Sequence, residues 1–130
     1  MGDYTPVSSD QSAYTLTAGA VITGGQLVTV SAASTAIPSV SGDRSVGVAA
    51  HDAPSGGRFT CYVLPGMIHE VLILSGNVVT CPGTVLAAAA GTVKVGAGLA
   101  ADAAAGTLLG MVLRGGTGDG TTVKAKFIGI

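Results

Sequence analysis

The sequence is poor in charged residues and in large aromatic side chains. Charged residues make up 10% of its 130 residues, aromatic residues make up 4%, and Trp is absent. A typical globular domain carries about 25% charged residues. Because a monomer with so few surface charges tends to associate, we expect other chains to cover part of this surface. The scarcity of aromatic rings weakens the case for a carbohydrate-binding site, which usually stacks sugars on such rings.

Basic residues are also few and scattered, and the formal net charge is −1. Only Lys124 and Lys126 lie close together, whereas a nucleic-acid-binding surface needs a cluster that neutralises several phosphates. We therefore predict no nucleic-acid partner. The first residues lack the basic and apolar segments of a secretory signal, and the uncharged run 71–93 is interrupted by glycine and proline. We predict no membrane-spanning helix.

Glycine, in contrast, is abundant, with 21 residues. Turn-forming residues separate short β-rich segments about every 8–12 residues, which is typical of a β-sandwich or β-barrel. The sequence predicts strands at 26–32, 35–40, 46–51, 58–64, 67–74, 84–88, 92–95, 108–113 and 121–128. Only 99–105 has a clear helical propensity. Because the repeat described next aligns it with the connection 39–44, we predict a loop or a short turn there.

An internal repeat organises these strands. Segment 45–66 matches 108–129 without a gap, and 22–28 is echoed by 79–86 with one inserted residue. The aligned glycines are Gly47 with Gly110, Gly57 with Gly120, and Gly66 with Gly129. We predict one all-β domain over 16–130, a compact barrel or sandwich-like fold of two similar modules (about 17–66 and 76–129). The polar residues 1–15 are predicted to form an extended N-terminal arm.

The two copies differ in their predicted outer faces. In the last strand Val123, Ala125 and Phe127 alternate with Lys124 and Lys126, as in a half-buried strand. The gapless alignment places Cys61 and Val63 where the lysines stand, so the first copy is predicted to have an apolar outer face.

An apolar outer face requires a cover, so we predict that Cys61, Val63 and His69 lie at a subunit interface. His69 also suits a hydrogen-bonded position in the core. Segment 67–74 is apolar on both faces, which predicts a central strand.

Candidate catalytic residues are few. Cys61 and Cys81 lack the paired spacing of a zinc or redox site, and His51 and His69 each precede a carboxylate that a strand directs to the opposite face. Segment 115–122 resembles a phosphate-binding loop, but it lacks the lysine and precedes a strand, so we predict a hairpin loop. We predict no enzymatic activity, no cofactor and no metal. A Cys–His hydrolase, a two-histidine metal site and a disulfide between the two cysteines remain open alternatives.

Several segments resemble the capsid decoration, or cement, proteins of tailed bacteriophages. These segments are 17–28, 45–49, 65–71, 83–86 and 109–112. The resemblance implies a β-rich homotrimer on the outer surface of the virion head, made in the host bacterial cytoplasm. There it would bridge subunits of the major capsid protein at three-fold and quasi-three-fold positions and so stabilise the head.

Some decoration proteins reach the capsid with an N-terminal arm. The resemblance therefore implies capsid contacts at residues of the predicted arm, namely Tyr4, Thr5, Pro6, Val7 and Tyr14. Two other functions are also compatible with the sequence. One is a different phage structural β-domain, such as a tail or fibre component, and the other is a carbohydrate-binding β-sandwich.

Overall fold

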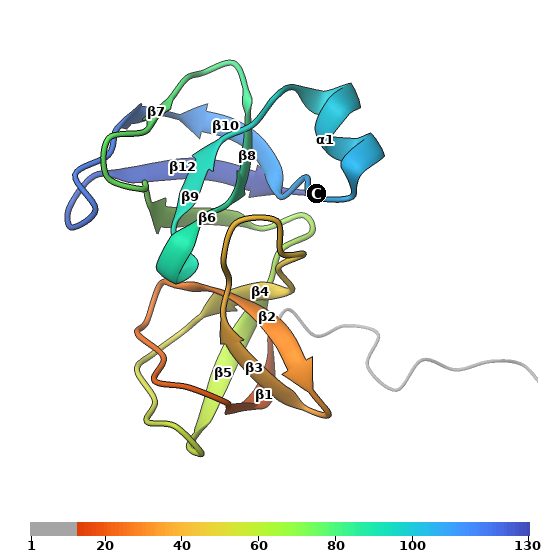
Figure 1. The fold of residues 1–130 in the computed structure, drawn as a ribbon, viewed down its shortest axis with the longest axis vertical. Coiled ribbons are helices and arrows are strands. Elements are labelled where there is room, and N and C mark those ends of the chain that lie inside the picture. The colour runs from red at the N-terminus through yellow and green to blue at the C-terminus, as the bar shows by residue number, and fades with distance from the viewer. Residues whose placement is uncertain (1–12) are drawn as a thin grey trace, which may run out of the picture.

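The computed structural model describes residues 13–130 (Figure 1). The predicted all-β class is confirmed, and each of the nine predicted strands overlaps an observed one. The strands are β1 (Ala13–Ala18), β2 (Leu27–Ala32), β3 (Thr35–Pro38), β4 (Gly47–Ala49), β5 (Arg58–Val63), β6 (Ile68–Leu72), β7 (Val78–Val79), β8 (Thr84–Ala87), β9 (Val93–Val95), β10 (Gly110–Arg114), β11 (Gly116–Thr117) and β12 (Lys124–Gly129). A 3₁₀ turn η1 (Ala89–Gly91) and a helix α1 (Leu99–Ala105) complete the described chain.

The first five strands form a closed barrel in the order β1-β3-β2-β4-β5. β1 pairs in parallel with β3 and antiparallel with β5, which closes the ring. The interior is apolar and is centred on Phe59, Cys61 and Val28, which are at most 1% exposed. β1 begins at Ala13, so the last three residues of the segment predicted as an arm form a strand with β5.

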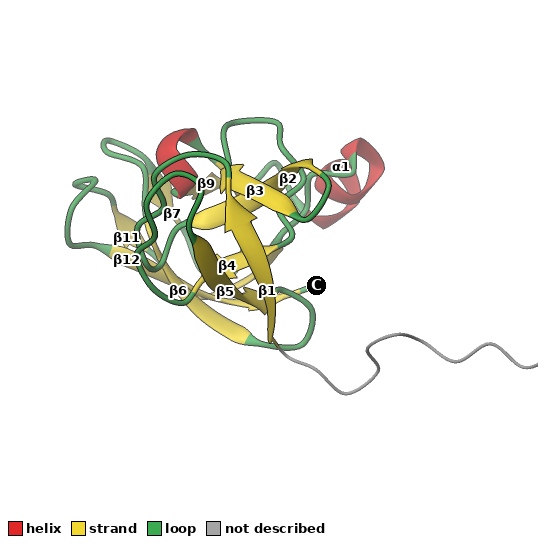
Figure 2. Ribbon diagram, turned by 90° about the horizontal axis from the view of Figure 1, so that it is seen from below, coloured by secondary structure: helices red, strands yellow, loops and turns green. Residues whose placement is uncertain are grey.

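The second five-stranded sheet, β6-β12-β10-β8-β9, repeats this pairing order. β6 corresponds to β1, β12 to β5, β10 to β4, β8 to β2 and β9 to β3. A parallel bridge between Ile73 and Val93 stands where β1 pairs with β3. The short pair β7–β11 likewise corresponds to the bridge between Ile22 and Ala53. The second half is therefore a copy of the first barrel that is only partly closed (Figures 1 and 2).

The strand register corrects the gapless alignment of the two copies. Gly47 in β4 pairs with Val63, and Gly110 in β10 pairs with Gly129. Gly129 is therefore the counterpart of Val63, and the predicted match with Gly66 is wrong. Val63 follows Gly47 by 16 positions, whereas Gly129 follows Gly110 by 19, so the second connection is three residues longer.

This shift reverses the predicted faces of β5. Successive strand residues point to opposite sides, so a shift by an odd number of residues exchanges inside and outside. Phe59 and Cys61 face the barrel interior, at 1% and 0% exposure, whereas Tyr62 is 41% exposed. The prediction that Cys61 lies on an outer face is wrong, because its counterpart in the second copy is Phe127 and not Lys124.

Two other local predictions are corrected as well. β6 is the terminal strand of its sheet, not a central one; its outward Ile68 is 55% exposed while Val71 is buried. Segment 99–105 is a helix, not a loop. Asp102 fixes it, because its buried carboxylate accepts hydrogen bonds from Thr84 Oγ1 (2.5 Å) and from the amide of Ala97 (3.0 Å).

The two barrels share part of one core. Leu27 in β2 and Val48 in β4 do not join the interior of their own barrel but belong to the apolar cluster of the second, with Phe127 and Val85. The outer side of β2 and β4 therefore seals the interior of the second barrel. Among residues 13–130, no helix has both the length and the apolar character needed to cross a membrane.

Candidate functional site

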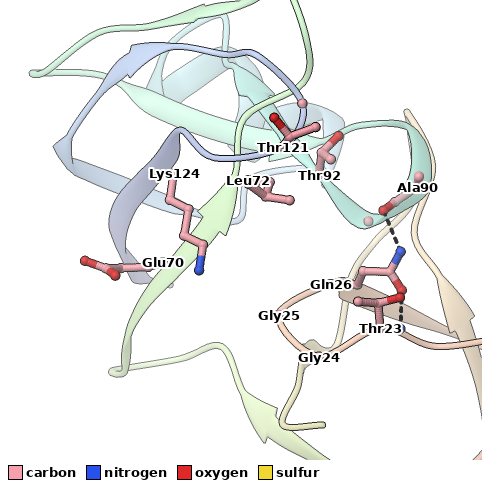
Figure 3. Close-up of a pocket in the computed structure, with 12 residues that line it drawn as sticks. Thr23, Gly24, Gly25, Gln26, Glu70, Leu72, Ala90, Thr92, Thr121 and Lys124 are labelled. Atoms are coloured by element: carbon pink, nitrogen blue, oxygen red, sulfur yellow. Dashed lines mark hydrogen bonds between the residues drawn. The ribbon is translucent and has the colours of Figure 1, made fainter. Parts of the chain in front are cut away.

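A cleft of about 360 Å³ lies between the two barrels (Figure 3). We call it the interbarrel cleft. It is lined by Thr23, Gly24, Gly25, Gln26, Glu70, Leu72, Ala90, Gly91, Thr92, Gly120, Thr121 and Lys124. The first barrel contributes one loop to it, and the second contributes β6, η1 and the beginning of β12.

The cleft exists because η1 is bonded to the first barrel. Gln26 Nε2 donates to the Ala90 carbonyl at 3.0 Å, and the Gly91 amide donates to the Ser39 carbonyl at 2.8 Å. In the first barrel the Thr17 amide donates to the Ser34 carbonyl at 2.8 Å and closes the seam between β1 and β3. Within residues 13–130, the equivalent seam of the second barrel is joined only at the bridge beside Ile73, and the cleft opens next to it.

Two charged side chains, Lys124 and Glu70, are among the residues that line the cleft. In the described part of the chain the Lys124 ammonium has no carboxylate within 4.0 Å. Glu70, on the same outer face, is directed away from the cleft (Figure 3) and pairs with Arg114 at 2.9 Å. The remaining polar lining consists of hydroxyl and main-chain groups. The arrangement suits binding of a polar or acidic segment.

No protein-family model and no curated protein matches the chain. A search of solved structures finds the head fiber gp8.5 N base in bacteriophage phi29, with a TM-score of 0.66 and 12% sequence identity. The match covers 91% of this chain and 92% of that chain. The two proteins share a fold. The similarity includes both barrels and is therefore a similarity of the duplicated architecture.

Of the predicted capsid contacts, Tyr4, Thr5, Pro6 and Val7 lie outside the described residues. Tyr14 lies in β1, half buried against the core of the first barrel, and its hydroxyl donates to the Val46 carbonyl at 3.2 Å. Burial, together with the nearby Cys61, raises the pKa of Tyr14. As a capsid contact, Tyr14 stays a prediction.

The three predicted interface residues are placed differently from one another. Cys61 is fully buried inside the first barrel and offers no surface to another subunit. His69 is 7% exposed; its Nε2 donates to the Val63 carbonyl at 2.8 Å, and its ring packs near Phe127. Burial lowers the pKa of His69. His69 is thus the hydrogen-bonded core histidine that the sequence also allowed, and Val63 as an interface residue stays a prediction.

The structure does not bring a cysteine and a histidine together in residues 13–130. Both cysteines are free thiols, so no disulfide joins them. His51 is exposed, with Nδ1 facing the Asp52 carbonyl and Nε2 accepting from the Thr60 amide. The same residues contain no group of three or more His, Cys, Asp or Glu side chains that could hold a metal ion.

The connection from β10 to β12 joins two antiparallel neighbours, as predicted for a hairpin, but its residues Gly116–Thr117 are not loop: they form β11 and pair with β7. Asp119 organises the part of this connection before β12. Asp119 Oδ1 accepts from the amides of Thr121, Thr122 and Val123, and Oδ2 accepts from the Thr122 hydroxyl. The bonds from Thr122, followed by those from Thr121 and Val123, lower the pKa of Asp119 well below its usual range. They orient the start of β12, including Lys124 at the edge of the cleft.

We expect Asp119→Asn to lower the melting temperature by a few degrees at pH 6 but by less at pH 2. Because the folded-state pKa of Asp119 is depressed, its contribution to stability is complete above the unfolded value of about 3.9 and is lost as the pH falls below it. Melting curves at both pH values measure this. An equal difference at pH 6 and pH 2 would show that the ionised carboxylate is not responsible.

Proposed function

We propose that this chain is a structural protein of a bacteriophage head, bound to the outer surface of the particle, where it stabilises the shell by bridging major capsid subunits. The observation that carries the proposal is the shared fold with a head fiber base over nine-tenths of both chains. The resemblance of the sequence to capsid decoration proteins points to the same location.

The surface of the described chain supports a binding role. Ile68 on β6 pairs with Ile128 on β12, and Ile128 pairs with Met111 on β10, so an apolar row crosses three strands of the second sheet. Ile68 and Ile128 are 55% and 37% exposed. Covering such side chains releases roughly 25 cal/mol per Å² of apolar surface. A homotrimer would present three such rows, and their combined avidity would exceed the affinity of each.

A second candidate is the base of a head appendage, which would hold a longer fibre. The description of the phi29 protein as a fiber N base favours it. Both candidates place the chain on the outside of the head. They differ in whether a further protein extends outward from it in the particle.

Deleting residues 1–12 is expected to reduce binding to undecorated heads at least tenfold while changing the melting temperature by less than about 3 °C. The deletion ends before Ala13 because β1 pairs with β5 from that residue onward. Sedimentation of heads with bound protein measures saturation by the full and shortened chains.

Each outcome of this experiment decides one part of the proposal. Full saturation by the shortened chain would contradict the role of residues 1–12 in head binding. Failure of the full chain to sediment with heads would contradict the proposed function itself.

A further inference from the structure

The outer face of the second sheet combines an apolar row with a charged row. Ile68 of β6 pairs with Ile128 of β12 in the first row, and Glu70 pairs with Lys126 in the next. Residues two apart in a strand lie on one side of the sheet, so both rows share this face. Arg114 of β10 extends the charged row, because it pairs with Lys126 and its guanidinium reaches Glu70 across β12 at 2.9 Å. We call this surface the β6–β12 face.

The corresponding face of the first barrel is already covered. Val48 of β4 is the counterpart of Met111 of β10, because each directly follows the glycine that sets the register. Val48 is 6% exposed and packs, together with Leu27, in the core of the second barrel. In the second copy α1 covers the β8 end of the equivalent row, where Asp102 bonds to Thr84, but the two isoleucines are exposed. The duplicated design thus uses this face once to bind a barrel, and the second copy of the face is uncovered within residues 13–130.

The β6–β12 face also concentrates positive charge. Three of the six basic residues of the chain lie on it, namely Arg114, Lys126 and, two residues earlier in β12, Lys124. Glu70 is the carboxylate of the face, and Arg114 engages it. Among residues 13–130, neither lysine has a carboxylate within 4.0 Å. A partner that covers the isoleucines must therefore supply anions for two cations, since charges buried without partners are costly.

A second copy of this chain does not supply those anions. Placing the β6–β12 face against itself would bring the lysines of both copies together, and like charges across an interface are unfavourable. The first barrel has as many cations as carboxylates, namely Arg44 and Arg58 with Asp43 and Asp52. The remaining carboxylates of the second barrel are bonded within the chain. The complement of the face is therefore a different protein surface, with carboxylates beside apolar side chains.

We propose that the β6–β12 face docks on an acidic surface of a major capsid subunit, whose carboxylates meet Lys124 and Lys126 and whose apolar side chains meet Ile68 and Ile128. The inference rests on the proposed function for the identity of the partner, and it adds which face binds and by what chemistry. Charge steers the approach and fixes the orientation, whereas hydrophobic burial contributes affinity that sodium chloride does not screen. The two contributions can therefore be measured separately.

Sedimentation of undecorated heads with the full chain and its variants, at about 50 mM and about 300 mM sodium chloride, tests this contact. Lys126→Glu is expected to raise the dissociation constant at least tenfold at the lower salt concentration and by clearly less at the higher one. Arg58→Glu is the matched control and is expected to leave binding unchanged. It makes the same charge change at an exposed position of β5, the strand of the first barrel that corresponds to β12.

Two further variants separate the apolar row from the charged row. Ile68→Ser is expected to weaken binding by about the same factor at both salt concentrations, because it removes apolar area and no charge. Glu70→Gln is expected to tighten binding, because it removes the carboxylate that faces those of the partner. All four variants are expected to melt within about 3 °C of the unchanged chain, since each substituted side chain is exposed or half-buried.

The outcomes distinguish this inference from the proposed function. If the unchanged chain saturates heads and Lys126→Glu binds as well as Arg58→Glu, the docking face is wrong and the proposed function stands. An oligomer of the isolated chain that Ile68→Ser dissociates would place a second copy on the β6–β12 face and would also overturn the inference. Failure of the unchanged chain to sediment with heads would contradict the proposed function, and this inference with it.

Discussion

Gly129→Ala is expected to destabilise the protein by more than about 3 kcal/mol, or to prevent folding. Gly129 is buried at the end of β12, where it forms a parallel bridge with Pro65 at the junction of the two barrels. A Cβ atom there would overlap the carbonyl oxygen and carbon of Leu64. Since this obstacle is backbone and not the end of a side chain, the junction itself would have to move. Urea denaturation measures the change in the free energy of unfolding.

Gly66→Ala is the matched control, because the gapless alignment treats Gly66 and Gly129 as equivalent. Gly66 lies in an exposed turn with a φ of 75°, and a Cβ there would meet nothing within 4 Å. Its substitution is expected to cost only the left-handed backbone penalty of about 1–2 kcal/mol. Equal losses at both positions would contradict the register described here.

Phe127→Ala is expected to cost about 3–5 kcal/mol, since it empties a fully buried site in the core of the second barrel. Because Leu27 and Val48 of the first barrel belong to the same core, we also expect the first barrel to lose stability. Hydrogen exchange measures protection of β5 amides and β12 amides separately. Both sets are expected to lose protection by the same free energy, as in one cooperative unit.

The control for this prediction is Leu113→Ala, at an apolar position that is 47% exposed. A surface substitution of this kind is expected to change stability by no more than about 0.5 kcal/mol. If Phe127→Ala lowered protection in β12 and left β5 unchanged, the two barrels would be independent domains, and the shared cluster would carry little energy.

The strand pattern could be predicted from the sequence because turns and alternation are local signals. In β12 the alternation of Ala125 and Phe127 with two lysines gives the correct faces. β1 lies outside the predicted strands, although Leu16 and Ala18 alternate there with Thr15 and Thr17 and are buried in the first barrel. Helix α1 agrees with the local helical propensity of 99–105; the wrong expectation of a loop came from the repeat alignment with 39–44.

The predicted inward and outward faces of β5 were wrong because of one error in the alignment of the two copies. A repeat of low identity fixes the order of strands but not the length of each connection, and three extra residues before β12 exchanged inside and outside for Cys61. The pairing partners of Gly47 and Gly110 carry the correct register, and these come from the folded chain.

The interbarrel cleft has no sequence signal. Its lining comes from four separate segments, and none of them contains a binding motif. Gln26 and Ser39 of the first barrel bond to η1 of the second, next to the cleft. The first barrel is closed between β1 and β3, whereas the second is joined at the equivalent position only by the bridge between Ile73 and Val93 in the described residues. From the sequence similarity of the two copies alone, one would expect both barrels to be closed by the same strand pairs.

Cryo-electron microscopy of phage heads incubated with the purified chain tests the central claim most directly. We predict density for both barrels on the outer surface of the head, in contact with neighbouring major capsid subunits at three-fold and quasi-three-fold positions. Bare heads at saturating protein, or density on the tail alone, would contradict the account.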